Sequence, residues 1–209
     1  MDKPVCKAAL FDFDGTLVDT EPQYSIFWGR QGERYHPEIP NFERVIKGQT
    51  LGQIFDGYFS NMPEVQKLIT EELNEFEQTM KFAYISGAKE YVLRLREKGI
   101  KTAIVTSSND KKMAHVYRAC PEVKEMFDLI LTSDMFTRSK PDPDCFLSAA
   151  NLLGCTPDEC VVYEDSLHGL QAARNSCMRV IALATTLPAE RIAPLADEVW
   201  TDFNDADID

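Results

Sequence analysis

From residue 87 onward, short apolar runs alternate with segments of helical periodicity. The apolar runs are expected to form strands, and they are Ile100–Thr106, Asp128–Thr132, Cys160–Tyr163, Arg179–Leu183 and Glu198–Thr201. The helical patterns are Lys89–Lys98, Asp110–Ala119, Pro143–Leu153 and Ser166–Asn175. A further apolar run, Ala8–Phe11, comes before all of them. Apolar strands alternating with helices predict an α/β fold, a Rossmann-like, doubly wound parallel sheet covered on both faces.

Residues 21–85 follow a different pattern, with several helical segments and no strand alternation. The helical segments are Glu21–Arg34, Leu51–Phe59 and Glu64–Phe82. We therefore expect a small helical cap at 21–85, inserted into a catalytic core formed by residues 1–20 and 86–209.

Several helix ends carry recognisable capping residues. Asp142 is expected to be an N-cap with Pro143 as the first helical residue, and Ser166 and either Ser108 or Asn109 are expected to cap two other helices. Gly99 is well placed just beyond the C-terminus of a helix.

Polar clusters stand where three of the predicted strands end. They are Asp12 to Asp14, Thr106 to Ser108 and the pair Glu164-Asp165, and Ser139-Lys140 forms a fourth cluster in a loop. In a parallel sheet, ligands bind beyond the carboxyl ends of the strands, so these clusters should meet at one rim. Carboxylates at the end of a buried strand repel each other and lose hydration, and a divalent cation offsets this because hard cations prefer carboxylate oxygen.

Composition and charge narrow the classes of partner. The 209 residues suffice for one core plus a modest second unit, and 44% of them are hydrophobic. A net charge of −12 repels phosphate backbones and anionic lipids, so we expect neither nucleic acid nor a membrane as a partner. A site for a phosphorylated substrate must then be locally positive. No secretory signal, no membrane-spanning run and no C-x-x-C pair is evident, so we expect free thiols and a cytoplasmic location.

The clusters match an ordered set of motifs. Asp12-Phe13-Asp14-Gly15-Thr16-Leu17-Val18-Asp19-Thr20 is followed by Thr106, by Lys140 in Ser-Lys-Pro-Asp-Pro, and by Glu164-Asp165-Ser166. In these segments the chain resembles the haloacid dehalogenase superfamily, and in particular its helical-cap phosphatases of the β-phosphoglucomutase and phosphoglycolate phosphatase type. The resemblance covers nearly the whole chain.

The resemblance implies four catalytic roles. Asp12 is the nucleophile that forms an aspartyl phosphate, and Asp14 is the general acid and base. Lys140 offsets negative charge on the nucleophile and the phosphoryl group, and the hydroxyl of Thr106 binds a phosphoryl oxygen. An aspartate at position 14 disfavours the dehalogenase branch, which lacks it.

The resemblance also implies a Mg²⁺ site and a phosphate cradle. The expected ligands are Asp12, the backbone carbonyl of Asp14, Asp165, and Glu164 either directly or through water. Glu164-Asp165 also precedes a helix, so a capping function can coexist with ligation. The backbone N–H groups of Ser107 and Ser108 are expected to help bind phosphate, and Gly15 to let the chain turn tightly beside it.

The cap departs from the pattern of the sugar phosphomutases. Leu51 stands where their cap loop supplies an arginine, and a histidine that follows the first motif in those enzymes is replaced near Tyr24. These departures favour hydrolysis. The substrate-facing cap residues are expected to be Tyr24, Lys47, Gln49 and Thr50.

The leading hypothesis is a monomeric Mg²⁺-dependent phosphatase for a small phosphorylated metabolite, such as a sugar or polyol phosphate. A phosphomutase in which Lys47 replaces the missing arginine is the first alternative, and a pyrophosphatase on the same machinery is another. A non-catalytic module that binds a phosphorylated metabolite is a fourth hypothesis, which the presence of both Asp12 and Asp14 disfavours.

Overall fold

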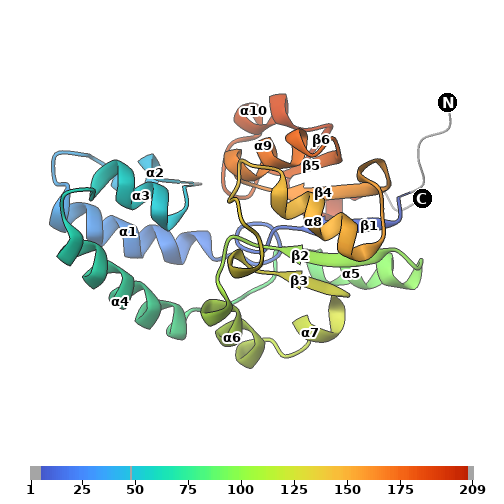
Figure 1. The fold of residues 1–209 in the computed structure, drawn as a ribbon, viewed down its shortest axis with the longest axis horizontal. Coiled ribbons are helices and arrows are strands. Elements are labelled where there is room, and N and C mark those ends of the chain that lie inside the picture. The colour runs from blue at the N-terminus through green and yellow to red at the C-terminus, as the bar shows by residue number, and fades with distance from the viewer. Residues whose placement is uncertain (1–5, 48, 207–209) are drawn as a thin grey trace. The chain divides into compact units, whose positions relative to one another are not determined.

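The structure, a computed structural model, describes residues 6–47 and 49–206 (Figure 1). Residues 1–5 and 207–209 of the predicted core, Gly48 of the predicted cap, and most of the N-terminal segment from which we expected no secretory signal lie outside the described residues. The chain divides into two compact units, Thr20–Lys81 and the two stretches on either side of it. The predicted cap boundaries, 21 and 85, differ from these by one and four residues.

A six-stranded sheet forms the centre of the larger unit, and all its neighbouring strands are parallel. Its strand order is β3-β2-β1-β4-β5-β6, so the chain runs outward from the central β1 in one direction and then in the other. The strands are β1 (Ala8–Phe11), β2 (Lys101–Val105), β3 (Leu129–Leu131), β4 (Cys160–Glu164), β5 (Arg179–Leu183) and β6 (Glu198–Trp200). The predicted doubly wound α/β fold is confirmed.

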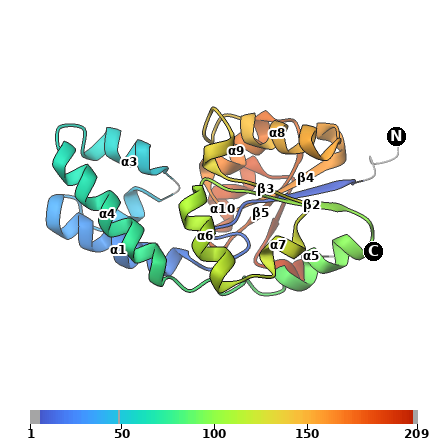
Figure 2. The same cartoon turned by 60° about the horizontal axis from the view of Figure 1, so that its bottom comes forward.

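Helices lie on both faces of the sheet (Figure 2). They are α5 (Ala88–Glu97), α6 (Asp110–Ala119), α7 (Val123–Met126), α8 (Asp144–Leu153), α9 (Leu167–Asn175) and α10 (Ala189–Ile192). Leu10 and Val162 pack with α8 and α9 on one face. Phe11 and Tyr163 point to the other face, where their rings stack at 4.5 Å and join an aromatic cluster with Tyr91 and Phe203. Because side chains alternate between the two faces along a strand, β1 is packed on both faces of the sheet.

Helix ends follow the predicted capping chemistry with one exception. Asn109 caps α6, Ser166 caps α9, and Gly99 has a positive φ just after α5, as predicted. The predicted start of α8 is wrong by one residue, because the side chain of Asp142 accepts a hydrogen bond from the backbone N–H of Asp144, and Pro143 is the N-cap.

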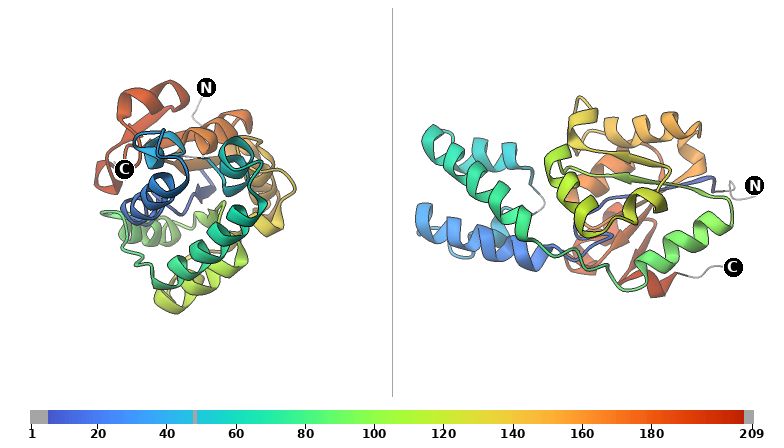
Figure 3. Two further views of the ribbon diagram at one scale, coloured as in Figure 1. Left: turned by 90° about the vertical axis from the view of Figure 1, so that its left-hand side faces the viewer. Right: turned by 90° about the horizontal axis from the view of Figure 1, so that it is seen from below.

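The helical unit contains α1 (Glu21–Tyr35), α2 (Phe42–Val45), α3 (Leu51–Tyr58) and α4 (Pro63–Thr79). The two long helices, α1 in blue and α4 in teal, can be followed in Figure 3. They run antiparallel, since Tyr24 near the start of α1 contacts Glu77 near the end of α4. The predicted end of α4 at Phe82 is wrong, because Met80 is already extended and Lys81 exchanges two hydrogen bonds with Gln23.

Among the described residues, no helix has the length and apolar character needed to cross a bilayer. All six cysteines are described and are free thiols.

Candidate active site

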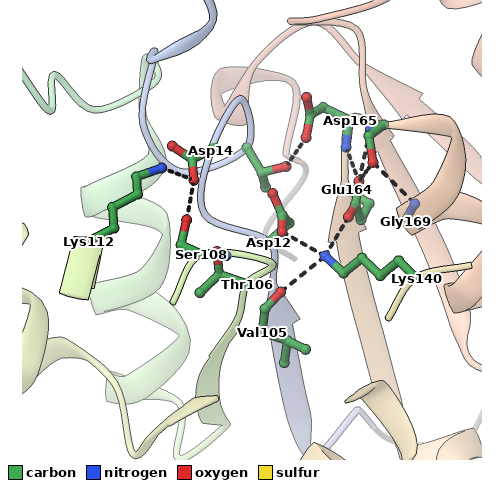
Figure 4. A network of polar contacts seen from close by, with 12 residues as sticks. Asp12, Asp14, Val105, Thr106, Ser108, Lys112, Lys140, Glu164, Asp165 and Gly169 are labelled. Atoms are coloured by element: carbon green, nitrogen blue, oxygen red, sulfur yellow. Dashed lines mark hydrogen bonds and ion pairs between the residues drawn. The ribbon is translucent and has the colours of Figure 1, made fainter. Parts of the chain in front are cut away.

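The register of the sheet brings the predicted polar clusters to one edge. Phe11 is level with Ile104 of β2 and with Tyr163 of β4. Asp12 therefore leaves β1 between the last residues of β2 and β4, next to the reversal in strand order where such folds bind ligands. Figure 4 shows the side chains that meet there.

Lys140 lies at the centre of this edge, although it comes from a loop. Its Nζ donates to Asp12 Oδ1 at 2.6 Å, to Glu164 Oε1 at 2.7 Å and to the carbonyl oxygen of Val105 at 3.1 Å. Only 3% of the residue is exposed. Burial alone would lower the pKa of Lys140, but the two carboxylates outweigh it and raise that pKa, so the ammonium stays charged.

Asp12 has the opposite electrostatic balance. Burial raises the pKa of its carboxyl group to about 7, and Glu164 and Asp14 add to the rise while Lys140 opposes it. A cation that binds this carboxylate favours its ionised form.

Glu164 is held by the start of α9. Its Oε2 accepts hydrogen bonds from the backbone N–H of Asp165 at 2.8 Å and of Ser166 at 2.8 Å, and from the Ser166 hydroxyl at 3.0 Å. A Cβ added to Gly169 would lie 1.6 Å from Glu164 Oε1, so only glycine leaves room for this side chain. The glutamate thus ties the helix start to Lys140. Its predicted role as a metal ligand stays a prediction.

Asp165 faces the loop that follows β1. Its Oδ1 accepts a hydrogen bond from the Thr16 hydroxyl at 2.9 Å. A Cβ on Gly15, whose φ is +79°, would lie 2.2 Å from Asp165 Oδ2. Gly15 is therefore needed both for its left-handed backbone and for the close approach of this carboxylate.

The buried acidic cluster offers oxygen donors of the kind that Mg²⁺ prefers. Asp12, Glu164 and Asp165 each offer a carboxylate oxygen, and these oxygens lie within 4.8 Å of one another. The nearby hydroxyl of Thr186 is buried without a hydrogen-bond partner. Three hard oxygens and few ligands fit a cation that keeps several of its waters.

The carboxylate of Asp14 does not join that cluster but points toward α6 (Figure 4). Its Oδ2 accepts hydrogen bonds from the Ser108 hydroxyl at 2.8 Å and from Lys112 Nζ at 2.5 Å. Its predicted metal ligand is the backbone carbonyl, which leaves the side chain available for a separate role.

Sequence reasoning missed Lys112 and Gly169. The sequence does carry one signal for Lys112, since a lysine in the first turn of a helix opposes the helix dipole.

Thr106 and the serines after it form a tight turn. The backbone N–H of Ser108 donates to Thr106 Oγ1 at 3.0 Å, so the predicted phosphate donor has a partner within the turn. Thr106 and Ser108 are buried, and Ser107 is exposed. Their phosphate-binding roles stay predictions.

The four predicted cap residues all lie in the helical unit. Thr50 caps α3 in a reciprocal box with Gln53, and Tyr24 donates to Glu77 at 2.9 Å. Lys47 Nζ lies 3.4 Å from Glu21, and the Gln49 side chain donates to the Val45 carbonyl oxygen at 3.4 Å. Their predicted contacts with substrate stay predictions.

A family model described as haloacid dehalogenase-like hydrolase matches residues 9–183. Hexitol phosphatase A from Escherichia coli (strain K12) is 30% identical over 194 residues, which are 90% of this chain and 87% of that protein. Protein SUPPRESSOR OF QUENCHING 1, chloroplastic, from Arabidopsis thaliana is 45% identical over 101 residues, 48% of this chain, and that match spans only 10% of the relative.

A crystal structure titled HAD hydrolase, family IA, variant 3, from Entamoeba histolytica HM-1:IMSS superposes with a TM-score of 0.84. It is 24% identical, and the match covers 97% of this chain and 96% of the other. This likeness shows a shared fold.

Proposed function

Since the chain belongs to the haloacid dehalogenase-like hydrolases, we propose that it is a Mg²⁺-dependent phosphatase acting on a small phosphomonoester through an aspartyl phosphate. One observation carries the proposal. The buried Asp12 carboxylate accepts a hydrogen bond from Lys140 at 2.6 Å, and it offers an oxygen within 4.8 Å of carboxylate oxygens of Asp165 and Glu164.

Asp12 serves as the nucleophile. Its oxygen attacks phosphorus, the bond between phosphorus and the ester oxygen breaks, and the phosphoryl group moves to Asp12. The Lys140 ammonium sits 2.6 Å from this carboxylate, so it can offset the charge that the incoming phosphate adds.

Asp14 completes the cycle as acid and base. It passes a proton to the leaving alcohol in the first step, and in the second it takes a proton from the water that attacks the aspartyl phosphate. The directions of the two side chains support separate roles, since Asp12 faces Lys140 while the carboxylate of Asp14 faces Ser108 and Lys112.

Mg²⁺ would be held by Asp12, Asp165 and the backbone carbonyl of Asp14, with Glu164 as a further ligand or as the group that fixes Lys140. When bound, the cation orients the phosphate and offsets its charge. Asp165 is kept in place for this by the Thr16 hydroxyl.

A sugar or polyol phosphate is the substrate class that we favour. The name of the relative Hexitol phosphatase A supports it, and the helical unit would supply the selective contacts through Tyr24, Lys47, Gln49 and Thr50. A monomeric state and a cytoplasmic location complete the proposal.

The test is release of inorganic phosphate from a panel of hexose, pentose and polyol phosphates, with pyrophosphate included, in the presence of Mg²⁺. Asp12→Asn should reduce kcat by at least about a thousandfold, whereas Asp158→Asn, a change at an exposed residue in the short turn before β4, should leave it unchanged. EDTA should abolish turnover, and added Mg²⁺ should restore it.

An Asp12→Asn variant with normal turnover would refute the assignment. Isomerisation of β-glucose 1-phosphate without phosphate release would identify a mutase, and turnover of pyrophosphate alone a pyrophosphatase. Ligand binding without turnover across the panel would identify a binding module.

A further inference from the structure

Lys112 is a buried cation at an unusual place. It is the third residue of α6, in the first turn of the helix, and only 3% of it is exposed. Burial disfavours a charged ammonium, and so does the positive end of the helix dipole. A lysine there needs a compensating anion.

Asp14 supplies such an anion. Lys112 Nζ lies 2.5 Å from Asp14 Oδ2, and the Ser108 hydroxyl donates to the same oxygen at 2.8 Å. The backbone of Lys112 is fixed as well, because its N–H donates to the Asn109 side chain at 2.9 Å. The ammonium and the hydroxyl therefore approach one carboxylate oxygen from the first turn of α6 and from the turn before it, as Figure 4 shows.

We propose that Lys112 is a positioning residue, which orients the carboxylate of Asp14 for proton transfer to the leaving alcohol. This inference rests on the proposed function, in which Asp14 is the general acid. In that step the Asp12 oxygen bonds to phosphorus, the phosphorus–oxygen bond of the ester breaks, and the Asp14 proton moves to the departing oxygen.

Two substrates distinguish a role of Lys112 in proton transfer from a general role in substrate binding or folding. An alkyl phosphate needs a proton on its leaving oxygen, whereas the nitrophenolate of p-nitrophenyl phosphate leaves without one. The ratio kcat/KM covers the steps up to formation of the aspartyl phosphate, so it reports on this proton transfer even when later hydrolysis is slow.

The experiment compares Lys112→Met with Lys111→Met, the same change at the exposed neighbour in α6. For the alkyl substrate, Lys112→Met should lower kcat/KM by about ten- to a hundredfold, with less than about threefold loss for p-nitrophenyl phosphate. Lys111→Met should leave both values unchanged. In an Asp14→Asn background, Lys112→Met should add little further loss for the alkyl substrate, because the two residues act as a unit.

Equal losses for the two substrates, a raised KM for both, or no loss would overturn the inference. Circular dichroism and thermal melting check that each variant folds. If Lys112→Met does not fold, Lys112→Arg keeps the charge but moves the donor, and the same unequal loss is expected of it. Asp12→Asn run beside these variants keeps the two proposals apart, since its retained activity would refute the proposed function itself.

Discussion

Two buried lysines, Lys140 and Lys112, each bind an aspartate of the loop after β1, and both are 3% exposed. Their partners differ. Lys140 holds the side chains of Asp12 and Glu164, of which 11% and 1% are exposed, together with a backbone carbonyl. Lys112 holds Asp14, whose side chain is 19% exposed.

Lys140 therefore neutralises two buried carboxylates, whereas Lys112 pairs with a carboxylate that is partly exposed to solvent. Removal of Lys140 leaves two carboxylates together in a dry environment, where each is costly without a partner. Removal of Lys112 leaves one carboxylate that solvent and Ser108 still reach. We therefore expect Lys140 to contribute to both folding and chemistry, and Lys112 mainly to the direction of Asp14.

The largest effect should come from Lys140→Met. It strands Asp12 and Glu164, so the free energy of unfolding should fall by about 3–5 kcal/mol and kcat by at least about a hundredfold. Urea unfolding and steady-state kinetics measure both values, with the exposed Lys111→Met as control. Stability equal to that of the control would remove the distinction between the two lysines.

Gly169→Ala tests whether the space left for Glu164, which binds Lys140, contributes to stability. Alanine is normally better than glycine inside a helix, but here its Cβ would overlap Glu164, so we expect a loss of about 1–3 kcal/mol. Gly57→Ala is the matched control, because nothing lies within 4 Å of its Cβ in α3, and it should stabilise by about 0.5–1 kcal/mol. Equal melting temperatures for the two variants would contradict the close fit around Glu164.

Asp12→Asn tests the charge balance at Lys140 through pH. Burial raises the pKa of Asp12 from 3.8 to about 7, so between these values the folded state binds more protons than the unfolded state and stability falls as pH rises. Asp12→Asn lacks the carboxyl group, so it does not lose stability in this way as pH rises. In EDTA it should be more stable than the wild type above pH 7, and the gap should close as pH falls toward 4.

Thermal melting from pH 4 to 8 measures this difference, with Asp158→Asn as an exposed control that should show none. Mg²⁺ should raise the melting temperature of the wild type more than that of Asp12→Asn. A constant gap at every pH, or an equal gain from Mg²⁺, would argue against the ionised Asp12 as a ligand.

The smallest effect is expected from Ser108→Ala. The change removes the hydroxyl donor to Asp14 Oδ2 and leaves Lys112 in place, so kcat/KM should fall less than about tenfold and stability by about 1 kcal/mol. The exposed Ser60→Ala provides the comparison. A loss as large as that of Lys112→Met would mean that the hydroxyl, and not the ammonium, sets the direction of Asp14.

The predicted family and parallel α/β core are confirmed, and so is the prediction that the protein is a hydrolase of this family. Apolar runs such as Cys160–Tyr163 are buried along their whole length, so the hydrophobic pattern was sufficient to predict them as strands. Ends of elements were harder. Met80 leaves the helical pattern because Gln23, far away in the sequence, binds the backbone of Lys81.

Sequence alone determined the strand-and-helix order and singled out the residues that we propose for phosphoryl chemistry, because burial periodicity and motif spacing are local properties of the chain. Tertiary structure decided which charged groups pair with one another. The pairing of Lys140 with both Asp12 and Glu164, and of Lys112 with Asp14, joins residues 24 to 128 positions apart. Electrostatic energies depend on distance and burial in space, and strand order and register set both.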